Sequence, residues 1–212
     1  MPKKILLLAA LILTLPSMAL AAAESERTLE LSSYKCKLTL PSGKFDWLEP
    51  SPILKAVAAM GDDSEAWMIL MIHPLPEGLS IQESYRKGFE NGFAQSSAAT
   101  VLESKTINFK GAPCFEIHAR LDQDGSVISV RALAANGHIY QLMVMGSDLP
   151  VEKRGELEAF FSAFDFIGAP NLPTPRTDSA QDLGYQIGRL TGFLLVAIVA
   201  LKLFSRWRKK QA

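Results

Sequence analysis

An apolar stretch near the C-terminus constrains the fold of this chain more than any other feature. Residues 190–201 read LTGFLLVAIVAL and contain no charged side chain. The next residue, Lys202, stands where its methylene stem can follow apolar surface while its ammonium reaches lipid headgroups, so the apolar run extends over residues 187–204. About 18 residues at about 1.5 Å each cover roughly 27 Å, close to the thickness of a bilayer core. We therefore expect a single transmembrane helix over residues 184–205.

A basic tail, residues 206–212, follows the apolar stretch. It reads RWRKKQA and combines a tryptophan, which suits the membrane interface, with four basic side chains. By the positive-inside rule such a tail stays in the cytoplasm, which places the rest of the chain on the other side of the membrane. The alternative is a C-terminal helix that docks on the protein's own core.

Three glycines recur at four-residue spacing where the apolar stretch begins. Gly184, Gly188 and Gly192 fall on one face of a helix. Small residues at this spacing let two helix backbones approach closely in lipid, so they predict a helix contact and self-association through the membrane helix. The alternative is that they reflect only the abundance of glycine in membrane helices.

The N-terminus has the pattern of a secretory signal peptide over residues 1–23. Two lysines precede an apolar run over residues 5–15, and small residues then offer cleavage sites. An uncleaved first membrane helix is the alternative. Together with the basic tail, this signal predicts a single-pass protein of the inner (plasma) membrane, with an exported domain over residues 24–167 on the periplasmic side.

The exported part is acidic, although the whole chain has a formal net charge of +0. Residues 24–170 contain 20 acidic and 13 basic side chains. Because this excess of negative charge disfavours contact with a phosphate backbone, we expect no nucleic acid partner.

The first half of the exported domain shows strand patterns followed by a helix. Residues 34–40 alternate apolar and polar side chains, which is typical of a half-buried strand. Residues 55–60 and 66–72 flank a Gly-Asp-Asp-Ser turn and predict a hairpin, with a helix over the first of them as the alternative. Ser80 and Glu83 have the capping-box spacing, so a helix is expected to begin there.

This expected helix carries an apolar stripe and two glycines. Gly88 and Gly92 weaken it by about 1 kcal/mol each relative to alanine, unless another element packs closely against them. The stripe, whose members are four residues apart, is expected to face the core. Its members are Ile81, Tyr85, Phe89 and Phe93.

The second half predicts a meander of strands and a closing helix. Residues 115–121, 127–134 and 140–145 have strand patterns and are separated by Asp-Gly and Asn-Gly turns. Asp148 and Pro150 are expected to open a final helix that reaches the segment FFSAFDFI. The side chains of this helix that are expected to face a core are Leu157, Phe160, Phe161 and Phe164. The proline-rich residues 168–181 are expected to form a semi-rigid spacer that holds the domain off the membrane.

These elements indicate an α+β fold, in which helices pack on an antiparallel sheet. The segments LPSGKFDW, NGHIYQL and FFSAFDFI, within residues 31–167, resemble PsbP-type α/β/α sandwich domains. The chain is also similar to bacterial envelope proteins of the DcrB type. The resemblance implies binding, assembly and accessory roles rather than one chemistry, and it carries over no catalytic or ligand residue.

The sequence contains none of the common catalytic or metal-binding motifs. It has no HExxH, GxSxG or Walker pattern, and His73, His118 and His138 lack the spacing of a zinc site. We therefore expect neither an enzyme nor a cofactor. Glu116, His118 and Arg120 share one face of a predicted strand and form a candidate site for acid–base chemistry or an anion. The alternative is a solvated strand face, or one covered by the polar edge of a helix.

The two cysteines are candidates for a disulfide. Cys36 and Cys114 both fall in the exported domain, where disulfides persist, and a bridge would close a long loop. Against a bridge, Cys36 has the apolar parity of its strand and Cys114 the polar parity of its own. A bridge then requires a bulge at residues 111–113 that changes the register, so both states stay open.

The order of signal, domain and anchor leads us to expect a non-enzymatic accessory domain that binds a protein partner in the cell envelope or scaffolds an assembly there. The alternative is a small-molecule or lipid-binding module with a pocket between sheet and helix, beneath Tyr85 and Phe89. A nucleophile hydrogen-bonded to His118 or His138 in a cleft would instead favour an enzyme.

Overall fold

The computed structural model describes residues 27–40, 54–60, 66–77, 83–146, 158, 161–174 and 180–209. The expected signal peptide and the capping-box serine lie outside these residues. The elements, in chain order, are β1 (Arg27–Leu31), the 3-10 helix η2 (Ser32–Tyr34), β2 (Cys36–Leu40), β3 (Leu54–Met60), β4 (Ala66–Pro74), α2 (Glu83–Ser97), β5 (Ala99–Phe109), β6 (Ala112–Leu121), β7 (Val127–Ala135), β8 (His138–Gly146), β9 (Phe164–Phe166) and α4 (Ala180–Lys209).

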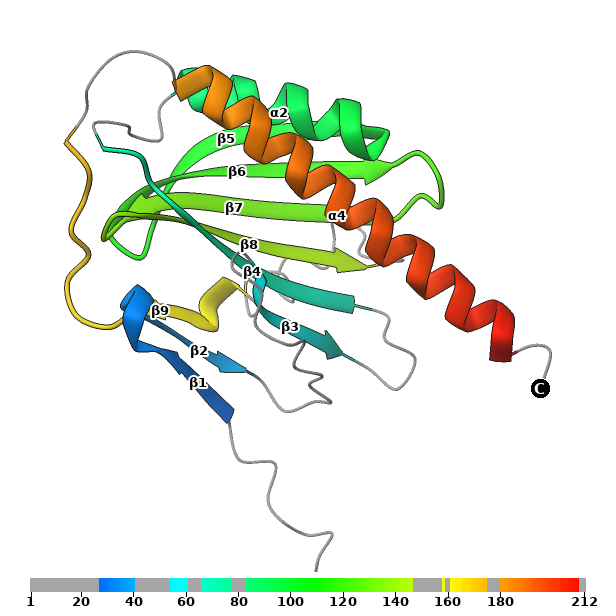
Figure 1. Cartoon of the computed structure of the whole chain (residues 1–212), viewed down its shortest axis with the longest axis horizontal. Coiled ribbons are helices and arrows are strands. Elements are labelled where there is room, and N and C mark those ends of the chain that lie inside the picture. Colours follow the sequence, from blue (N-terminus) through cyan, green and yellow to red (C-terminus); the bar gives the residue numbers. More distant parts are fainter. Residues whose placement is uncertain are drawn as a thin grey trace, which may run out of the picture.

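Six strands form one antiparallel sheet in the order β3-β4-β8-β7-β6-β5 (Figure 1). The predicted hairpin of β3 and β4 is confirmed, with Met60 paired to Ala66, so the helical alternative for its first strand is wrong. The predicted meander of β6, β7 and β8 is also confirmed. Its Asn-Gly turn has the left-handed backbone that a two-residue hairpin requires, with φ of 52° at Asn136 and 73° at Gly137.

A second, three-stranded antiparallel sheet, β1-β2-β9, covers one face of the large sheet (Figure 1). Cys36 and Leu38 of β2 are fully buried and pack with residues of β4, β6, β7 and β8. The Tyr140 hydroxyl on β8 donates a hydrogen bond of 2.5 Å to the carbonyl oxygen of Tyr34. One apolar core therefore lies between the two sheets.

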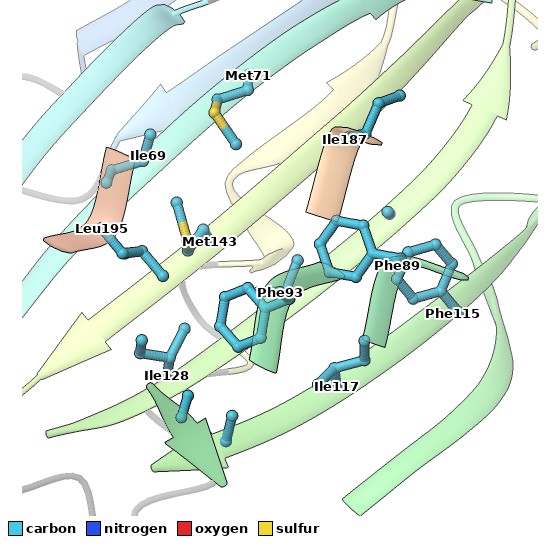
Figure 2. Packing of buried hydrophobic residues seen from close by; sticks show 14 of the residues in the cluster. Ile69, Met71, Phe89, Phe93, Phe115, Ile117, Ile128, Met143, Ile187 and Leu195 are labelled. Carbon is cyan, nitrogen blue, oxygen red and sulfur yellow. The ribbon is translucent and has the colours of Figure 1, made fainter. Parts of the chain in front are cut away.

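The opposite face of the large sheet is covered by α2 and α4 (Figure 1). Tyr85, Phe89 and Phe93 of α2 are each at most 1% exposed, which confirms the predicted core stripe over these residues. The ring of Phe89 lies 5.2 Å from that of Phe115 on β6, and Figure 2 shows these two side chains together. A second core therefore fills the space between the sheet and the helices.

The first half of α4 packs on the same face of the sheet. Ile187, Thr191 and Leu195 are 6%, 0% and 0% exposed, and Figure 2 places Ile187 and Leu195 beside the strand residues. Within the described part of the chain, no helix is long and apolar enough to cross a membrane. The structure thus differs from the transmembrane helix expected over residues 184–205. The first half of α4 instead docks on the protein's own core, which was the alternative.

The segment before α4 lies against the domain. The backbone N–H of Asn136 donates to the Asn171 carbonyl oxygen at 2.7 Å, and the N–H of Asn171 donates to the Asn136 side-chain oxygen at 2.9 Å. Helix α4 then begins at Ala180, inside the expected spacer of residues 168–181. The folded unit therefore continues past residue 167 into α4, and residues 168–174 are tied to it instead of extending away.

Three strands have no counterpart among the sequence predictions: β1, β5 and β9. At β5 a register shift between Val101 and Glu103 interrupts the pairing with β6, and the strand lies at the sheet edge, so its burial does not follow a strict period of two. The segment FFSAFDFI is not one helix, because Phe164 to Phe166 pair with β2 as strand β9. The first strand of the domain, β1, pairs with β2.

Both faces of the large sheet are covered. The fold is α+β with antiparallel sheets and two helices, as expected. Over the described residues the three-stranded sheet covers the face opposite α2 and α4, which differs from the expected α/β/α order of layers.

Candidate functional site

Helices α2 and α4 interlock through five glycines. A β-carbon built on Gly88 or Gly92 of α2 would lie 2.0 or 2.1 Å from a carbonyl oxygen of α4. A β-carbon built on Gly184 or Gly188 of α4 would lie 2.2 or 2.3 Å from a carbonyl oxygen of α2, and Gly192 continues the row against the last turn of α2. A backbone carbonyl cannot rotate away from such a β-carbon, so these four positions require glycine while the helices keep this spacing. At Gly192 the nearest atom is the side-chain oxygen of Ser96, at 2.0 Å, and the nearest backbone atoms lie at 3.0 Å.

The two helices run parallel. Gly184 lies against Tyr85, and Gly192 lies against Ser97, so residue numbers rise in the same direction along both helices. Helix α2 ends at Ser97, whereas α4 continues to Lys209, about 17 residues beyond Gly192. In Figure 1 the last turns of α4 run on past the end of α2.

The face that the sequence assigned to Gly184, Gly188 and Gly192 is a helix-contact face, and its partner here is α2 of the same chain. A second copy cannot occupy that face while α2 does. Gly88 and Gly92 were expected to weaken their helix, but no local pattern paired them with the glycines of α4. The four-residue spacing that both sets of glycines share was the signal for this helix contact. The close packing of the two backbones offsets the helix stability that Gly88 and Gly92 cost.

A small polar cluster ties α4 to the sheet beneath it. The Thr191 hydroxyl lies 3.2 Å from Gln141 Oε1 on β8, and His73 Nε2 on β4 lies 3.3 Å from the same oxygen. Thr191 and Gln141 are 0% exposed and His73 is 5% exposed. Burial lowers the pKa of His73, although its hydrogen bond with Gln141 opposes this, so the imidazole is neutral at pH 7.

On the other face of the sheet, Glu116 of β6 and Arg131 of β7 form a buried ion pair. Arg131 Nε donates to Glu116 Oε2 at 2.5 Å, and both residues are 4% exposed. Lys105 Nζ and His118 Nε2 each lie 3.2 Å from the other carboxylate oxygen. Burial alone would raise the pKa of Glu116, but hydrogen bonds from His118 and Arg131 and the charge of Arg131 lower it to about 2. The carboxylate is therefore ionised and has partners at both oxygens.

Arg131 joins this pair to a segment outside the sheet. Its guanidinium lies 4.9 Å from the Phe109 ring centre and 4.2 Å from that of Phe161, which is a cation–π arrangement on two rings. Its Nη1 and Nη2 donate to the carboxylate of Glu158 at 3.1 and 2.5 Å. The arginine therefore fastens Glu158 and Phe161 to the sheet.

A hydrogen bond joins His118 and Ser129, and its donor and acceptor are arranged as in a catalytic triad. His118 Nδ1 lies 2.6 Å from Ser129 Oγ, while Nε2 faces Glu116. Because a carboxylate only accepts, Nε2 is assigned the proton and Nδ1 accepts from the Ser129 hydroxyl. This is the order of nucleophile, base and acid. Ser129 is 1% exposed, so a substrate has no access to its oxygen in this structure.

The structure brings together two of the three polar residues that the sequence singled out. Glu116 and His118 belong to the network, but Arg120 is exposed, and among the described residues no hydrogen bond or ion pair joins it to the others. Ser129 and Arg131 of β7 were not predicted as part of the site; they lie opposite His118 and Glu116 in the sheet. The signal for Arg131 was a charged residue within the otherwise uncharged and largely apolar strand VISVRALAA.

Cys36 and Cys114 are free thiols in the same core between the two sheets. Cys114 was expected to point away from Cys36, because it alternates with the apolar residues of its strand. That expectation is wrong, since the small sheet covers this face of β6 where Cys114 lies. Burial raises the pKa of each thiol to about 12, and neither is a reactive thiolate at neutral pH.

Comparisons with known proteins identify the fold. No protein-family model and no curated protein matches the chain. Among solved structures, the chain is similar to cyanobacterial PsbP (CyanoP) from Synechocystis sp. PCC 6803, with a TM-score of 0.56 and 12% identity over 72% of this chain and 98% of that one. The PsbP-like fold expected from the sequence is thereby confirmed.

Two further structures match at lower TM-scores. The Saccharomyces cerevisiae Ran-binding protein Mog1p has a TM-score of 0.42 and 14% identity, over 79% of this chain and 92% of that one. The Pseudomonas aeruginosa protein PA94, a putative regulator of unknown function, has a TM-score of 0.42 and 15% identity, over 72% of this chain and 98% of that one. At these identities the likeness concerns the fold alone, and the CyanoP structure is the one that supports the PsbP-like fold of this chain.

Proposed function

We propose that this chain is a membrane-attached, non-enzymatic domain of the cell envelope that binds a protein partner or scaffolds an assembly. The division of α4 is the observation that carries the proposal. Its first half is fixed to α2 by glycines, whereas its second half continues past α2 with the sequence FLLVAIVALKLFSRWRK. An apolar run that ends in basic residues is typical of a segment at a lipid surface.

The polar network on the other face of the sheet supports a non-enzymatic role. Glu116 has partners at both carboxylate oxygens, and Arg131 binds Glu116 and Glu158 together. Because these charged groups pair with one another, they join β6, β7 and Glu158 within the domain. The expected export of the domain through a signal peptide, with the basic tail on the cytoplasmic side, stays part of the proposal.

A small-molecule or lipid pocket beneath Tyr85 and Phe89 receives less support. The Phe115 ring lies 5.6 Å from the ring of Tyr85 and 5.2 Å from that of Phe89, so side chains of the sheet fill the space below these two rings. We therefore prefer a partner-binding role to a ligand-binding one.

A hydrolase is a second candidate, because Ser129, His118 and Glu116 have the order of a nucleophile, a base and an acid. This function requires a movement that exposes the Ser129 hydroxyl. The test is labelling of the full chain with a fluorophosphonate probe, with Ser129→Ala as the control. Labelling that is absent from wild type, or unchanged in Ser129→Ala, would exclude Ser129 as a nucleophile.

Two measurements test the proposed function separately. Fractionation of cells that express the full chain tests attachment, and we expect the protein in the membrane fraction. Proximity labelling with the chain fused to a labelling enzyme tests partner binding, and we expect a reproducible set of envelope proteins that an unrelated domain on the same α4 residues 193–212 does not label. Recovery in the aqueous fraction would contradict attachment, and identical neighbours for both fusions would contradict specific partner binding.

A further inference from the structure

Two exposed apolar side chains stand together on the outer face of α4. Leu190 and Phe193 are 41% and 55% exposed and are three residues apart, so they are neighbours on the helix surface. The other large exposed apolar residues among those described lie on separate segments, as scattered ones usually do. They are Leu102, Ile167 and Leu172.

The exposed side of α4 changes character along the helix. Its first turns expose the polar residues Gln181, Asp182 and Gln186. Among residues 190–196, whose side chains the structure describes, the exposed ones are the apolar Leu190 and Phe193. In sequence, residues 194–204 contain one charged residue. The helix then reaches a run of basic residues around a tryptophan, over residues 206–210.

We propose that α4 inserts its exposed face from Leu190 onward, and the helix beyond the domain, into the headgroup region of an anionic bilayer. The buried face, with Gly192, Thr191 and Leu195, stays docked on α2 and the sheet. The inference rests on the proposed membrane attachment and names the lipid chemistry and the mode of insertion. The apolar side chains suit the boundary between headgroups and acyl chains, and the basic residues 206–210 complement anionic headgroups.

The length of the free part of α4 selects an interfacial position over a span. Because Gly184, Gly188 and Gly192 are held against α2, the largely apolar residues left between this contact and the basic run are residues 193–204. These 12 residues extend about 18 Å at about 1.5 Å each, and an apolar run of about 10–14 residues suits an interfacial segment better than a span. The docked protein therefore reaches into one side of a bilayer and rests its domain on that surface.

Flotation of the full chain with lipid vesicles tests the lipid chemistry. We expect binding to vesicles of equal parts phosphatidylglycerol and phosphatidylcholine, and binding to phosphatidylcholine alone that is at least about tenfold weaker. The double variant Leu190→Ser/Phe193→Ser is expected to bind the anionic vesicles at least about tenfold more weakly than wild type. The matched control is Leu102→Ser, whose parent side chain is 48% exposed on β5, and it is expected to bind like wild type.

A cross-link tests whether the helices stay docked on the membrane. The Tyr185 hydroxyl donates to Gln95 Oε1 at 2.9 Å, and Gln95 is exposed while Tyr185 is half-buried. Cysteines at these two positions, joined by a short bismaleimide, therefore fasten α4 to α2. We expect the cross-linked protein to bind anionic vesicles as well as the protein without cross-linker. Loss of binding after cross-linking would mean that α4 must leave α2 to meet lipid, which overturns the proposal.

The remaining outcomes also decide the question. Equal binding to neutral and anionic vesicles, or binding that Leu190→Ser/Phe193→Ser and Leu102→Ser weaken equally, overturns the proposal. If no vesicle is bound while the chain still fractionates with cell membranes, the lipid inference fails and attachment through a partner stands. If the chain is aqueous in cells, the proposed function itself fails.

Discussion

Gly188 of α4 lies against the backbone of Phe89 in α2, so closely that a β-carbon on this glycine would be 2.3 Å from the Phe89 carbonyl oxygen. The same relationship recurs one turn earlier between Gly184 and Tyr85, at 2.2 Å. Contacts of this kind bring glycine Cα–H groups toward carbonyl oxygens, which adds weak attraction to the close packing of the two backbones. The glycines thereby set the distance between the helices and hold α4 over the sheet.

Gly188→Ala is therefore expected to destabilise the folded chain. In an exposed helix, glycine to alanine stabilises by about 1 kcal/mol, because alanine restricts the unfolded chain and favours the helix. Here the added methyl group meets a carbonyl that belongs to a helix backbone and cannot rotate away. We expect a net loss of about 1–3 kcal/mol in the free energy of unfolding, measured by urea denaturation.

Gln186→Ala is the matched control on the same helix, since Gln186 is exposed and two residues from Gly188. Its effect is expected within about 0.5 kcal/mol of zero. A stabilised Gly188→Ala protein would show that the two helices are not in close contact at this residue.

Local patterns predicted much of the fold because their causes are local. The Asn136-Gly137 turn requires a left-handed backbone, and that requirement can be recognised from two adjacent residues. The stripe of Tyr85, Phe89 and Phe93 likewise follows from helical spacing. The edge strand β5 escaped prediction because its bulge between Val101 and Glu103 and its open edge remove the alternation that marks a half-buried strand.

The candidate site could be predicted only in part, because it is formed by residues of two neighbouring strands that are far apart in sequence. Glu116 and His118 were recognised because they lie two residues apart, but Arg131 and Ser129 join them only through the register of β6 and β7. The sequence left open whether α4 packs on lipid or on another helix, for a different physical reason. Apolar residues with small-residue spacing suit contact with lipid and contact with another helix equally well, so composition could not choose between α2 and a bilayer for residues 184–195.

Glu116→Gln is expected to cost about 3 kcal/mol or more in the free energy of unfolding. The substitution leaves the guanidinium of Arg131, which is 4% exposed, without its buried carboxylate partner. Arg120→Gln, on the same strand face but exposed, is expected to change stability by less than about 0.5 kcal/mol. Chemical denaturation at pH 7 measures both, and similar small effects for the two variants would mean that the ion pair contributes little.

The same pair predicts an acid limb in the stability profile. The pKa of Glu116 is lowered from 4.5 to about 2, so its contribution is fully present above about pH 4.5 and is lost as pH falls through about 2. In Glu116→Gln this part of the pH dependence is expected to disappear. A profile between pH 5 and 2 that is parallel in wild type and Glu116→Gln would contradict the assignment.

His73 predicts a separate loss of stability at milder acidity. Because burial lowers its pKa below 6.5, the unfolded chain takes up a proton before the folded chain does as pH falls. Stability is therefore expected to decrease from about pH 6.5 downward, toward the pKa of the folded state. His73→Asn removes this titration, so the difference in unfolding free energy between wild type and variant should change over that pH range. A constant difference from pH 7.5 to 5 would show that His73 titrates equally in both states.

The two cysteines are expected to be protected thiols in the folded chain. Burial raises the pKa of Cys36 and of Cys114 to about 12, and both side chains are at most 1% exposed, so thiolate and access are both lacking at pH 8. N-Ethylmaleimide should therefore add nothing to the native protein and two labels in urea, without any reductant, as read by mass spectrometry. Leu102→Cys, at a position whose side chain is 48% exposed, controls for the reagent and should take up one label in the native state. Labelling in urea that appears only after reduction would instead mean that Cys36 and Cys114 are bridged.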